Sequence, residues 1–216
     1  MTLTTDIFKP ISISPDQPME IVDVFSVSGQ KTITLQSHSS LVYLVVVSGV
    51  HVDIQFITKW PQCSCKIFGL FSSDAQHPVG GSLKVSLDHS QTSAEVELIS
   101  FLHDGAQITI DGTIDIGNHL DHVHGRLLQQ NIVLGKDISV KTLPKLNIAS
   151  HNVRASHGAN IDTLDQQKLF YMMSRGLTKE QSQKLLVDWY IEYVLSHFDA
   201  IDDSDKINIH TILTHY

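Results

Sequence analysis

The two cysteines are the first residues whose spacing could serve chemistry. Cys63 and Cys65 are separated by one residue in a stretch that predicts a strand, so their side chains would point to one face, about 6.5 to 7 Å apart. This is half of a metal site, because a tetrahedral zinc or an iron–sulfur cluster needs four ligands. The sequence holds no second cysteine pair. We therefore prefer to interpret both cysteines as small buried apolar residues.

Histidine is abundant, with 13 residues, and the run HLDHVH holds His119, His122 and His124 around Asp121. If this run is a strand, His122 and His124 share one face, and imidazole is a common ligand of zinc and iron. The other interpretation is a polar turn with surface histidines. The spacing matches neither HExxH nor another known ligand set. We favour the turn and predict no metal site of the chain's own.

Motifs of several enzyme classes are absent from the sequence. It contains no GxGxxG, no GxxxxGK[ST], no GxSxG and no Cys/His pair at a recognisable protease spacing. These absences argue against an enzyme with its own nucleotide site. A triad assembled in space would leave no such pattern, so a hydrolase stays as a minor alternative.

Composition limits the elements that can position these residues. The chain has 216 residues, 42% of them hydrophobic and 18% charged, as expected of a globular protein. A net charge of −8 without a basic run disfavours nucleic acid and anionic membranes as partners. The longest apolar run, Leu41 to Val47, is far shorter than the ~20 residues of a spanning helix. The N-terminus lacks the pattern of a secretory signal, and two cysteines suit a reducing compartment, so we expect a cytoplasmic protein.

Short stretches rich in Val, Ile, Thr and Ser run from Ile11 to about Ile161 and predict strands, because they alternate with period two between turn residues. The clearest are Leu41–Val47, Val52–Thr58, Leu83–Leu87, Ala94–Phe101, Gln107–Ile116, Arg126–Leu134 and Ile138–Ile148. Such a series fits an antiparallel sandwich or barrel, and it equally fits the stacked coils of a parallel β-helix. The pattern alone leaves both open.

After Ile161 the apolar period changes to that of helices, which divides the chain into a β-domain, 1–161, and a helical subdomain, 162–216. Capping boxes at Thr163/Gln166 and Thr178/Gln181 predict two helix starts, and Gly176 can end the first helix. The second should run to about His197, and a short helix is expected at Ile207–Leu213 after a solvated acidic tail. We expect the helices to cover the end of the β-domain. Their apolar sides would be formed by Leu164, Leu169, Phe170 and Met173, and by Leu185, Leu186, Trp189, Tyr193 and Val194.

A longer pattern runs from Leu143 to Leu177 and resembles the SufB/SufD family of iron–sulfur cluster assembly proteins, the SufD type above all. Similarity extends upstream to the stretch 131–135 and downstream to the helix 189–198, so it covers about a third of the chain. The matching residues are Pro144, Leu146, Ile148, Ser156–Ala159 (SHGA), Leu169–Tyr171 and Ser174–Gly176.

This resemblance implies a mainly β fold, a right-handed parallel β-helix with a C-terminal helical subdomain. It also implies a non-catalytic scaffold that pairs through its β-helix with a SufB-like subunit and docks on a SufC-like ATPase. In the SufD pattern the SHGA histidine, here His157, is implicated in cluster assembly, and a corner histidine that bonds a backbone group is the other interpretation. Tyr171 and Arg175 are expected to anchor the ATPase, whereas Phe170 and Trp189 are expected to pack the helices against the last coil.

The departures from the family pattern define the alternatives. Ala155 replaces a cysteine found before SHGA in some members, the SufB-type cluster cysteine would fall near Gln129, and the chain is much shorter than full-length members. We therefore expect no stably bound cofactor in the isolated chain, only a transient iron–sulfur cluster shared with a partner, and a homodimer when the chain is alone. One alternative is a self-associating β-helix interaction module that has lost cluster chemistry. A polysaccharide-acting β-helix enzyme is disfavoured, because carboxylates are sparse in the β-region.

Overall fold

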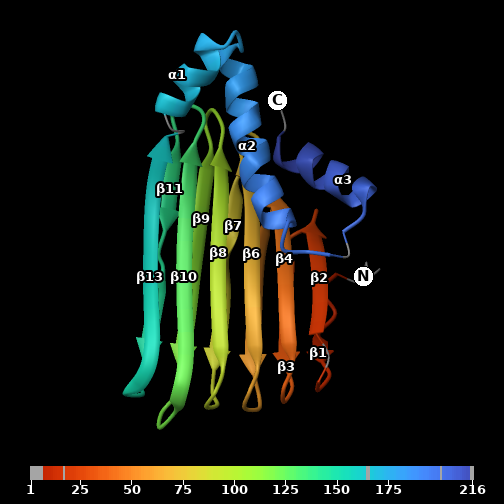
Figure 1. Ribbon diagram of the computed structural model, residues 1–216, viewed down its shortest axis with the longest axis vertical. Helices are drawn as coiled ribbons and strands as arrows, with labels where there is room; N and C mark the ends of the chain where they lie inside the picture. The colour runs from red at the N-terminus through yellow and green to blue at the C-terminus, as the bar shows by residue number, and fades with distance from the viewer. Residues whose placement is uncertain (1–6, 17, 164–165, 200, 215–216) are drawn as a thin grey trace.

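Strands of a computed structural model alternate between two parallel sheets that face each other (Figure 1). The structure describes residues 7–16, 18–163, 166–199 and 201–214, except for the side chain of Gln166. One sheet, called sheet A, has the order β1-β3-β5-β7-β9-β11, with β12 also paired to β9, and sheet B has the order β13-β10-β8-β6-β4-β2. The bounds are β1 Ile11–Ile13, β2 Pro18–Phe25, β3 Gly29–Leu35, β4 Ser40–Ser48, β5 His51–Thr58, β6 Ser64–Ser73, β7 Val79–Leu87, β8 Ser93–Leu102, β9 Gln107–Ile116, β10 Asp121–Val133, β11 Ser139–Thr142, β12 Lys145–Ile148 and β13 Asn152–Thr163.

Each coil contributes one strand to each sheet, so the prediction of a parallel β-helix followed by helices is confirmed, and the antiparallel alternative is wrong. Inward-facing residues stack in register from coil to coil. One column of sheet B runs through Tyr43, Ile67, Val96 and Leu127, all 2% exposed or less. Such columns fill the lumen between the sheets with aliphatic and aromatic side chains.

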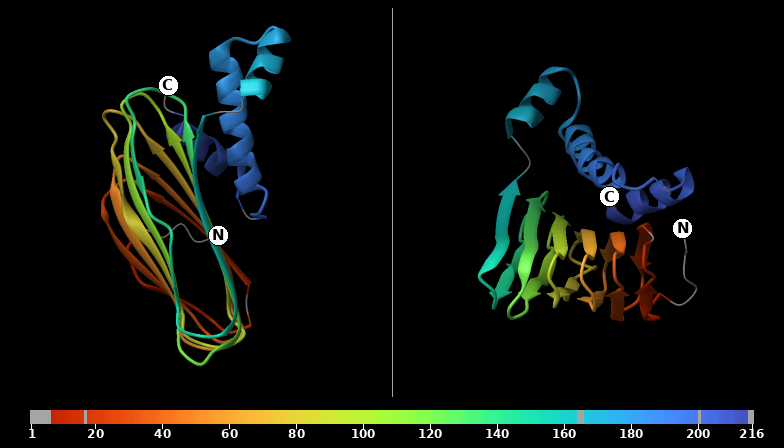
Figure 2. Two further views of the ribbon diagram at one scale, coloured as in Figure 1. Left: turned by 90° about the vertical axis from the view of Figure 1, so that its left-hand side faces the viewer. Right: turned by 60° about the horizontal axis from the view of Figure 1, so that its bottom comes forward.

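Helices cover the outer face of sheet B rather than the end of the β-domain, which corrects the prediction (Figure 2). The strands of sheet B that are continuous apolar runs in the sequence explain this arrangement. Outward residues of sheet B such as Leu44, Phe68 and Leu70 are fully buried, because helices pack on them. A strand that is buried on both faces is apolar at every position rather than at every second one.

The helices are α1 Gln166–Ser174, α2 Lys179–Leu195 and α3 Asp203–Leu213. The buried stripe of α2 is formed by Val187, Ile191, Val194 and Leu195. Val194 was expected there, but Trp189 is 57% exposed and Leu185 51%. Helix α2 is apolar on two sides, and its mainly aliphatic side packs on sheet B.

Helix boundaries follow local capping. The Thr178/Gln181 capping box is present, and Gly176 follows α1 with φ +96°, as predicted. Thr163 is the last residue of β13, but the proposed Thr163/Gln166 box and the contribution of Leu164 cannot be followed, because the Gln166 side chain and Leu164 lie outside the described residues. Helix α3 begins earlier than expected, because the carboxylate of Asp202 accepts the Asp205 N–H at 2.8 Å and caps it.

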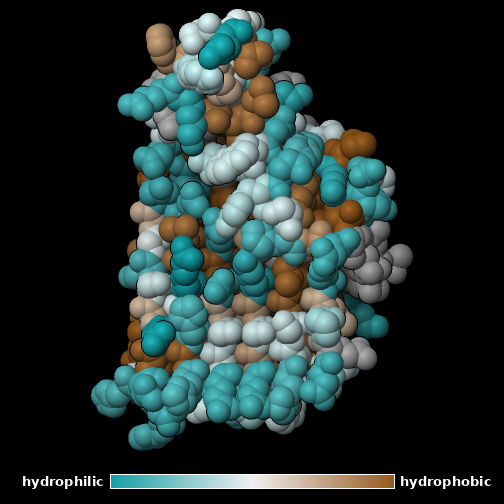
Figure 3. Space-filling view, viewed as in Figure 1, coloured by the Kyte–Doolittle hydropathy of each residue, from teal (hydrophilic) through white to brown (hydrophobic). Residues whose placement is uncertain are grey.

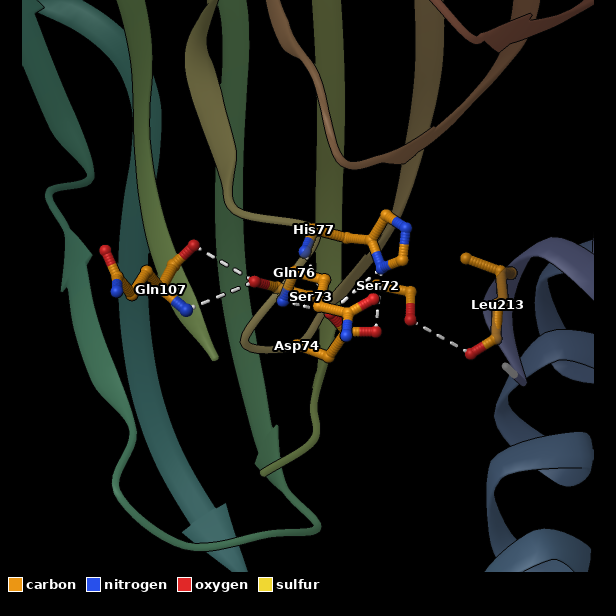
Figure 4. Close-up of polar contacts among 7 residues, drawn as sticks. All are labelled: Ser72, Ser73, Asp74, Gln76, His77, Gln107 and Leu213. Atoms are coloured by element: carbon orange, nitrogen blue, oxygen red, sulfur yellow. Dashed lines mark hydrogen bonds and ion pairs between the residues drawn. The ribbon is translucent and has the colours of Figure 1, made fainter. Parts of the chain in front are cut away.

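The last helix is tied to the sheet beneath it. Ser72 on β6 donates its hydroxyl to the backbone carbonyl of Leu213 at 3.1 Å (Figure 4). Ile209 and Leu213 are buried in the same interface. Among the described residues, no helix is long and apolar enough to cross a membrane.

The lumen holds one ionic group near its N-terminal coils. Lys31 of β3 forms an ion pair with Asp23 of β2, and the Tyr43 hydroxyl donates to the same carboxylate at 2.5 Å. Lys31 is 2% exposed and Asp23 is 3% exposed. Burial, followed by the charge of Asp23, raises the pKa of Tyr43 well above its usual value. The trio therefore links the two sheets inside the core.

We predict that Lys31→Met destabilises the fold by about 3 to 5 kcal/mol, because it leaves the Asp23 carboxylate buried without its cation. The double variant Asp23→Leu/Lys31→Met should recover most of the loss. Urea unfolding followed by circular dichroism measures both. Equal losses in the single and double variants would contradict this account.

Candidate functional site

Both ends of the coil stack leave sheet edges unpaired among the described residues, since β1 pairs only with β3, β2 only with β4 and β13 only with β10. The two ends differ in what lies over the lumen. At the N-terminal end Phe8 packs on Phe25, with ring centroids 5.4 Å apart, and joins the lumen core together with Ile7. At the other end β13 pairs with β10 and, within the described part of the chain, with no further strand. One edge of β13 therefore presents unpaired backbone N–H and C=O groups, which favour pairing with another chain.

Apolar side chains gather around this edge. We call the surface formed by β11, β12 and β13 the open end. Leu143, Ile148 and Ile161 are 49%, 46% and 57% exposed there. Val153 and Ala155 of β13 are only partly buried although they pack on the lumen core. The open end is thus core surface that no further coil covers in the described part of the chain.

His157 lies in the middle of β13, not at a corner. Its Cα is in register with Leu127, so it continues the inward column of sheet B, yet its side chain is exposed at the open end. Its Nδ1 lies 3.0 Å from the carbonyl oxygen of Pro144, in the link between β11 and β12. The backbone contact weighed from the sequence is present, and the exposed ring also remains accessible.

Polar side chains lie beneath the open end. Gln129, 2% exposed, donates its amide to the carbonyl of Ile110 at 3.3 Å, and the amide of Asn131 donates to the carbonyl of Asn160 at 3.0 Å. Pro144, Gln129 and Asn131 were not identified as parts of one site. The sequence did contain a signal for this site. Inward positions of the strand are otherwise apolar, but the two consecutive inward positions 129 and 131 carry amide side chains.

The cysteines belong to another part of the coil stack. Cys65 shares a register row with Ala94, Gly125 and Ala155, which places it three strand spacings from β13, roughly 14 Å. Both thiols are buried, so the prediction of small buried residues is confirmed. The Cys63 thiol donates to the carbonyl of Gln36 at 2.9 Å. Burial raises the pKa of Cys63, and burial followed by Cys63 raises that of Cys65 to about 12.

His119 lies in the turn between β9 and β10, and His122 and His124 lie at the start of β10. His122 has φ +56° and sits at an irregularity in the β10 register, so the alternative of a ligand pair on one regular strand face is not supported, whereas the favoured interpretation of surface histidines near a turn fits. His119 and His122 are exposed and His124 half-buried. The described residues hold no group of three or more His, Cys, Asp or Glu side chains suited to a metal ion. Hydrophilic residues line these corners along the lower rim (Figure 3).

The hairpin of α1 and α2 projects past the ends of the strands (Figure 1). Tyr171 is 59% exposed, and the Arg175 guanidinium lies 5.2 Å from its ring centroid. Phe170 is 74% exposed and Trp189 57%, so the expectation that these two pack against the last coil is wrong. The hairpin presents several large apolar side chains to solvent.

These features define a class of protein: a parallel β-helix with helices on one sheet, one covered end and one open end. Residues 25–189 match the family described as "SUF system FeS cluster assembly, SufBD core domain". The match covers most of the chain, and the chain belongs to this family.

Individual relatives agree with this assignment. Over 41% of this chain, the sequence is 28% identical to "Iron-sulfur cluster assembly protein SufD" of Escherichia coli. Over 59% of this chain, it is 26% identical to "Protein ABCI7, chloroplastic" of Arabidopsis thaliana. It is 23% identical to "Iron-sulfur cluster assembly protein SufB" of Bacillus subtilis over 66%. The matches span 21%, 27% and 32% of these relatives, so the chain corresponds to about a fifth to a third of their length.

We predict that neither thiol of the folded chain reacts with a disulfide reagent at pH 8, because only the thiolate attacks and both pKa values are raised. Unfolding in guanidinium chloride should release two reactive thiols per chain. Rapid labelling of one thiol before unfolding would contradict the burial described here.

Proposed function

We propose that this chain is a SufD-like scaffold subunit of iron–sulfur cluster assembly, non-catalytic in itself. The observation that carries the proposal is the open end, where an unpaired β13 edge, exposed apolar side chains and His157 coincide. Membership in the SufBD core family supplies the process in which this surface would work.

The occupant of the open end is proposed to be the β-helix of a SufB-like subunit. A partner strand would satisfy the free N–H and C=O groups of β13 and bury Leu143, Ile148 and Ile161. The nascent cluster is cargo in this scheme. The three strands of the open end hold one imidazole, His157, and no thiol among their described residues, which is too few ligands for a cluster. Cysteines of the partner would have to supply the rest.

The α1–α2 hairpin is proposed as the docking element for a SufC-like ATPase. It combines exposed aromatic rings with a cationic side chain, Arg175, held against Tyr171. Aromatic residues and arginine dominate many protein interfaces. This site lies on the helices and the pairing site lies on β13, so both partners could bind one chain.

The absent thiols favour a second candidate, a self-associating β-helix module without cluster chemistry. The resemblance implies a cysteine in place of Ala155 in some SufD-type members and a SufB-type cluster cysteine near Gln129, and this chain has neither. Such a module would use the same open end to bind a second copy of itself.

The two candidates are separated by anaerobic reconstitution of the chain with a cysteine-bearing SufB-like subunit and a SufC-like ATPase. We predict that the complex acquires iron and sulfide whereas the isolated chain does not. His157→Ala should lower the rate of loading at least tenfold while gel filtration shows intact assembly. A complex that never forms, or one that loads equally with His157→Ala, would contradict the proposed role.

We predict that Ala159→Lys/Ile161→Lys abolishes pairing, because it places two cations on the open end. The chain alone should be a dimer at micromolar concentration by light scattering, and the variant a monomer. Gln30→Lys, an exposed change on sheet A, is the matched control and should remain dimeric. Loss of pairing in the control would show that added charge, rather than the open end, is responsible.

We predict that Tyr171→Ala/Arg175→Glu weakens ATPase binding at least tenfold, measured by calorimetry with the full chain. Ile207→Ala on α3 is the matched control, since Ile207 is 67% exposed outside the hairpin. The double variant should keep its helical circular dichroism and its dimer. Undiminished binding would refute the docking assignment.

A further inference from the structure

The contact between His157 and Pro144 determines which nitrogen of the ring carries the proton. The carbonyl oxygen of Pro144 can only accept a hydrogen bond, and it lies 3.0 Å from Nδ1 of His157. Nδ1 must therefore donate. In a neutral imidazole the other nitrogen, Nε2, is then an unprotonated acceptor. Free histidine in water prefers the opposite tautomer, so this contact changes the state of the ring.

The carbonyl of Pro144 is held in place from both sides. Leu143 and Pro144 interrupt sheet A between β11 and β12, both of which pair with β9. Proline has no N–H to give to the ladder, which suits a break at an edge. Directly after it, the ammonium of Lys145 lies 3.3 Å from Asp111, and the amide of Asn147 donates to Asp115 at 2.6 Å.

His157 is also fixed from its own strand. Twelve residues of β13 pair with β10, and His157 is near the middle of that ladder. The ring thus bridges the last strand of sheet B and the last link of sheet A across the open end of the lumen. His157 is an exposed residue, and its printed hydrogen bond uses Nδ1, which leaves Nε2 as the nitrogen for a group that covers this end.

We propose that the Pro144 carbonyl is a positioning group that locks His157 in the Nδ1–H tautomer and presents Nε2 as the ligand atom at the open end. A backbone carbonyl that accepts from one ring nitrogen commonly orients a histidine whose other nitrogen is the ligand atom. The use of Nε2 as an iron ligand rests on the proposed function. The tautomer itself does not.

The first test is the tautomer of His157 in the isolated full chain. Histidine-selective ¹⁵N labelling and long-range ¹H–¹⁵N spectra near pH 8 distinguish protonated from unprotonated ring nitrogens, and comparison with His157→Ala assigns the signal. We expect a protonated Nδ1 and an unprotonated Nε2. A protonated Nε2 would overturn the proposal, whatever happens to cluster loading.

The second test separates the two nitrogens by substitution. In His157→Asn the side-chain amide can take the place of Nδ1–H and keep the bond to Pro144, with no group at the position of Nε2. In His157→Gln the amide reaches the Nε2 position instead. We expect His157→Asn to keep the unfolding midpoint and the assembled complex but to load iron and sulfide at least tenfold more slowly, as His157→Ala does.

Loading of the Asn variant at the wild-type rate would overturn the assignment of Nε2, because the Pro144 contact alone would then suffice. If the wild-type complex itself loads no cluster, the proposed function fails while the tautomer measurement still decides the positioning role. The two failures are therefore distinguishable.

Discussion

A parallel β-helix has to end, and the way it ends governs the rest of this structure. Every interior strand satisfies its backbone groups with the coils on either side, but a terminal strand leaves one edge unpaired. Here β1 and β2 end the two sheets on one side and also have one unpaired edge each among the described residues, but Phe8 and Ile7 pack over the lumen core at that end. The C-terminal strand β13 has no such cover among the described residues. Stacking of coils therefore forms the lumen, and the last strand of the stack, β13, has an edge suited to pairing with a second chain.

The helices cover one surface of the β-helix and leave another uncovered. They bury the apolar outer face of sheet B and so protect a region that would otherwise expose Leu44, Phe68 and Phe101. They leave the β13 edge unpaired, while the α1–α2 hairpin projects past the strand ends (Figure 2). The proposed pairing surface and the proposed docking surface therefore lie on different elements of one chain. His157 sits at the first of these surfaces, where its ring joins the last strand of sheet B to the link within sheet A.

Period-two alternation predicted the strands but left a sandwich, a barrel and a β-helix open, and the parallel β-helix was predicted only through the family resemblance. The sequence predicted the face of α2 poorly: Leu185, Trp189 and Tyr193 form a regular apolar stripe as convincing as the buried one. Periodicity shows that a side is apolar, not that something covers it. For the HLDHVH run the favoured turn interpretation fits, since the left-handed residues His119 and His122 break strand alternation there. The Pro144 contact joins residues thirteen apart through coil geometry, which no local pattern encodes.

The central claim is that β13 is a pairing edge for a SufB-like β-helix. Hydrogen–deuterium exchange of the full chain, alone under dilute monomeric conditions and in complex with that subunit, tests it most directly. The account predicts that amides of 152–163 exchange much more slowly in the complex, while the strands β1 and β2 at the covered end keep their rates. Unchanged exchange along β13, with protection appearing at the covered end or on sheet A, would contradict it.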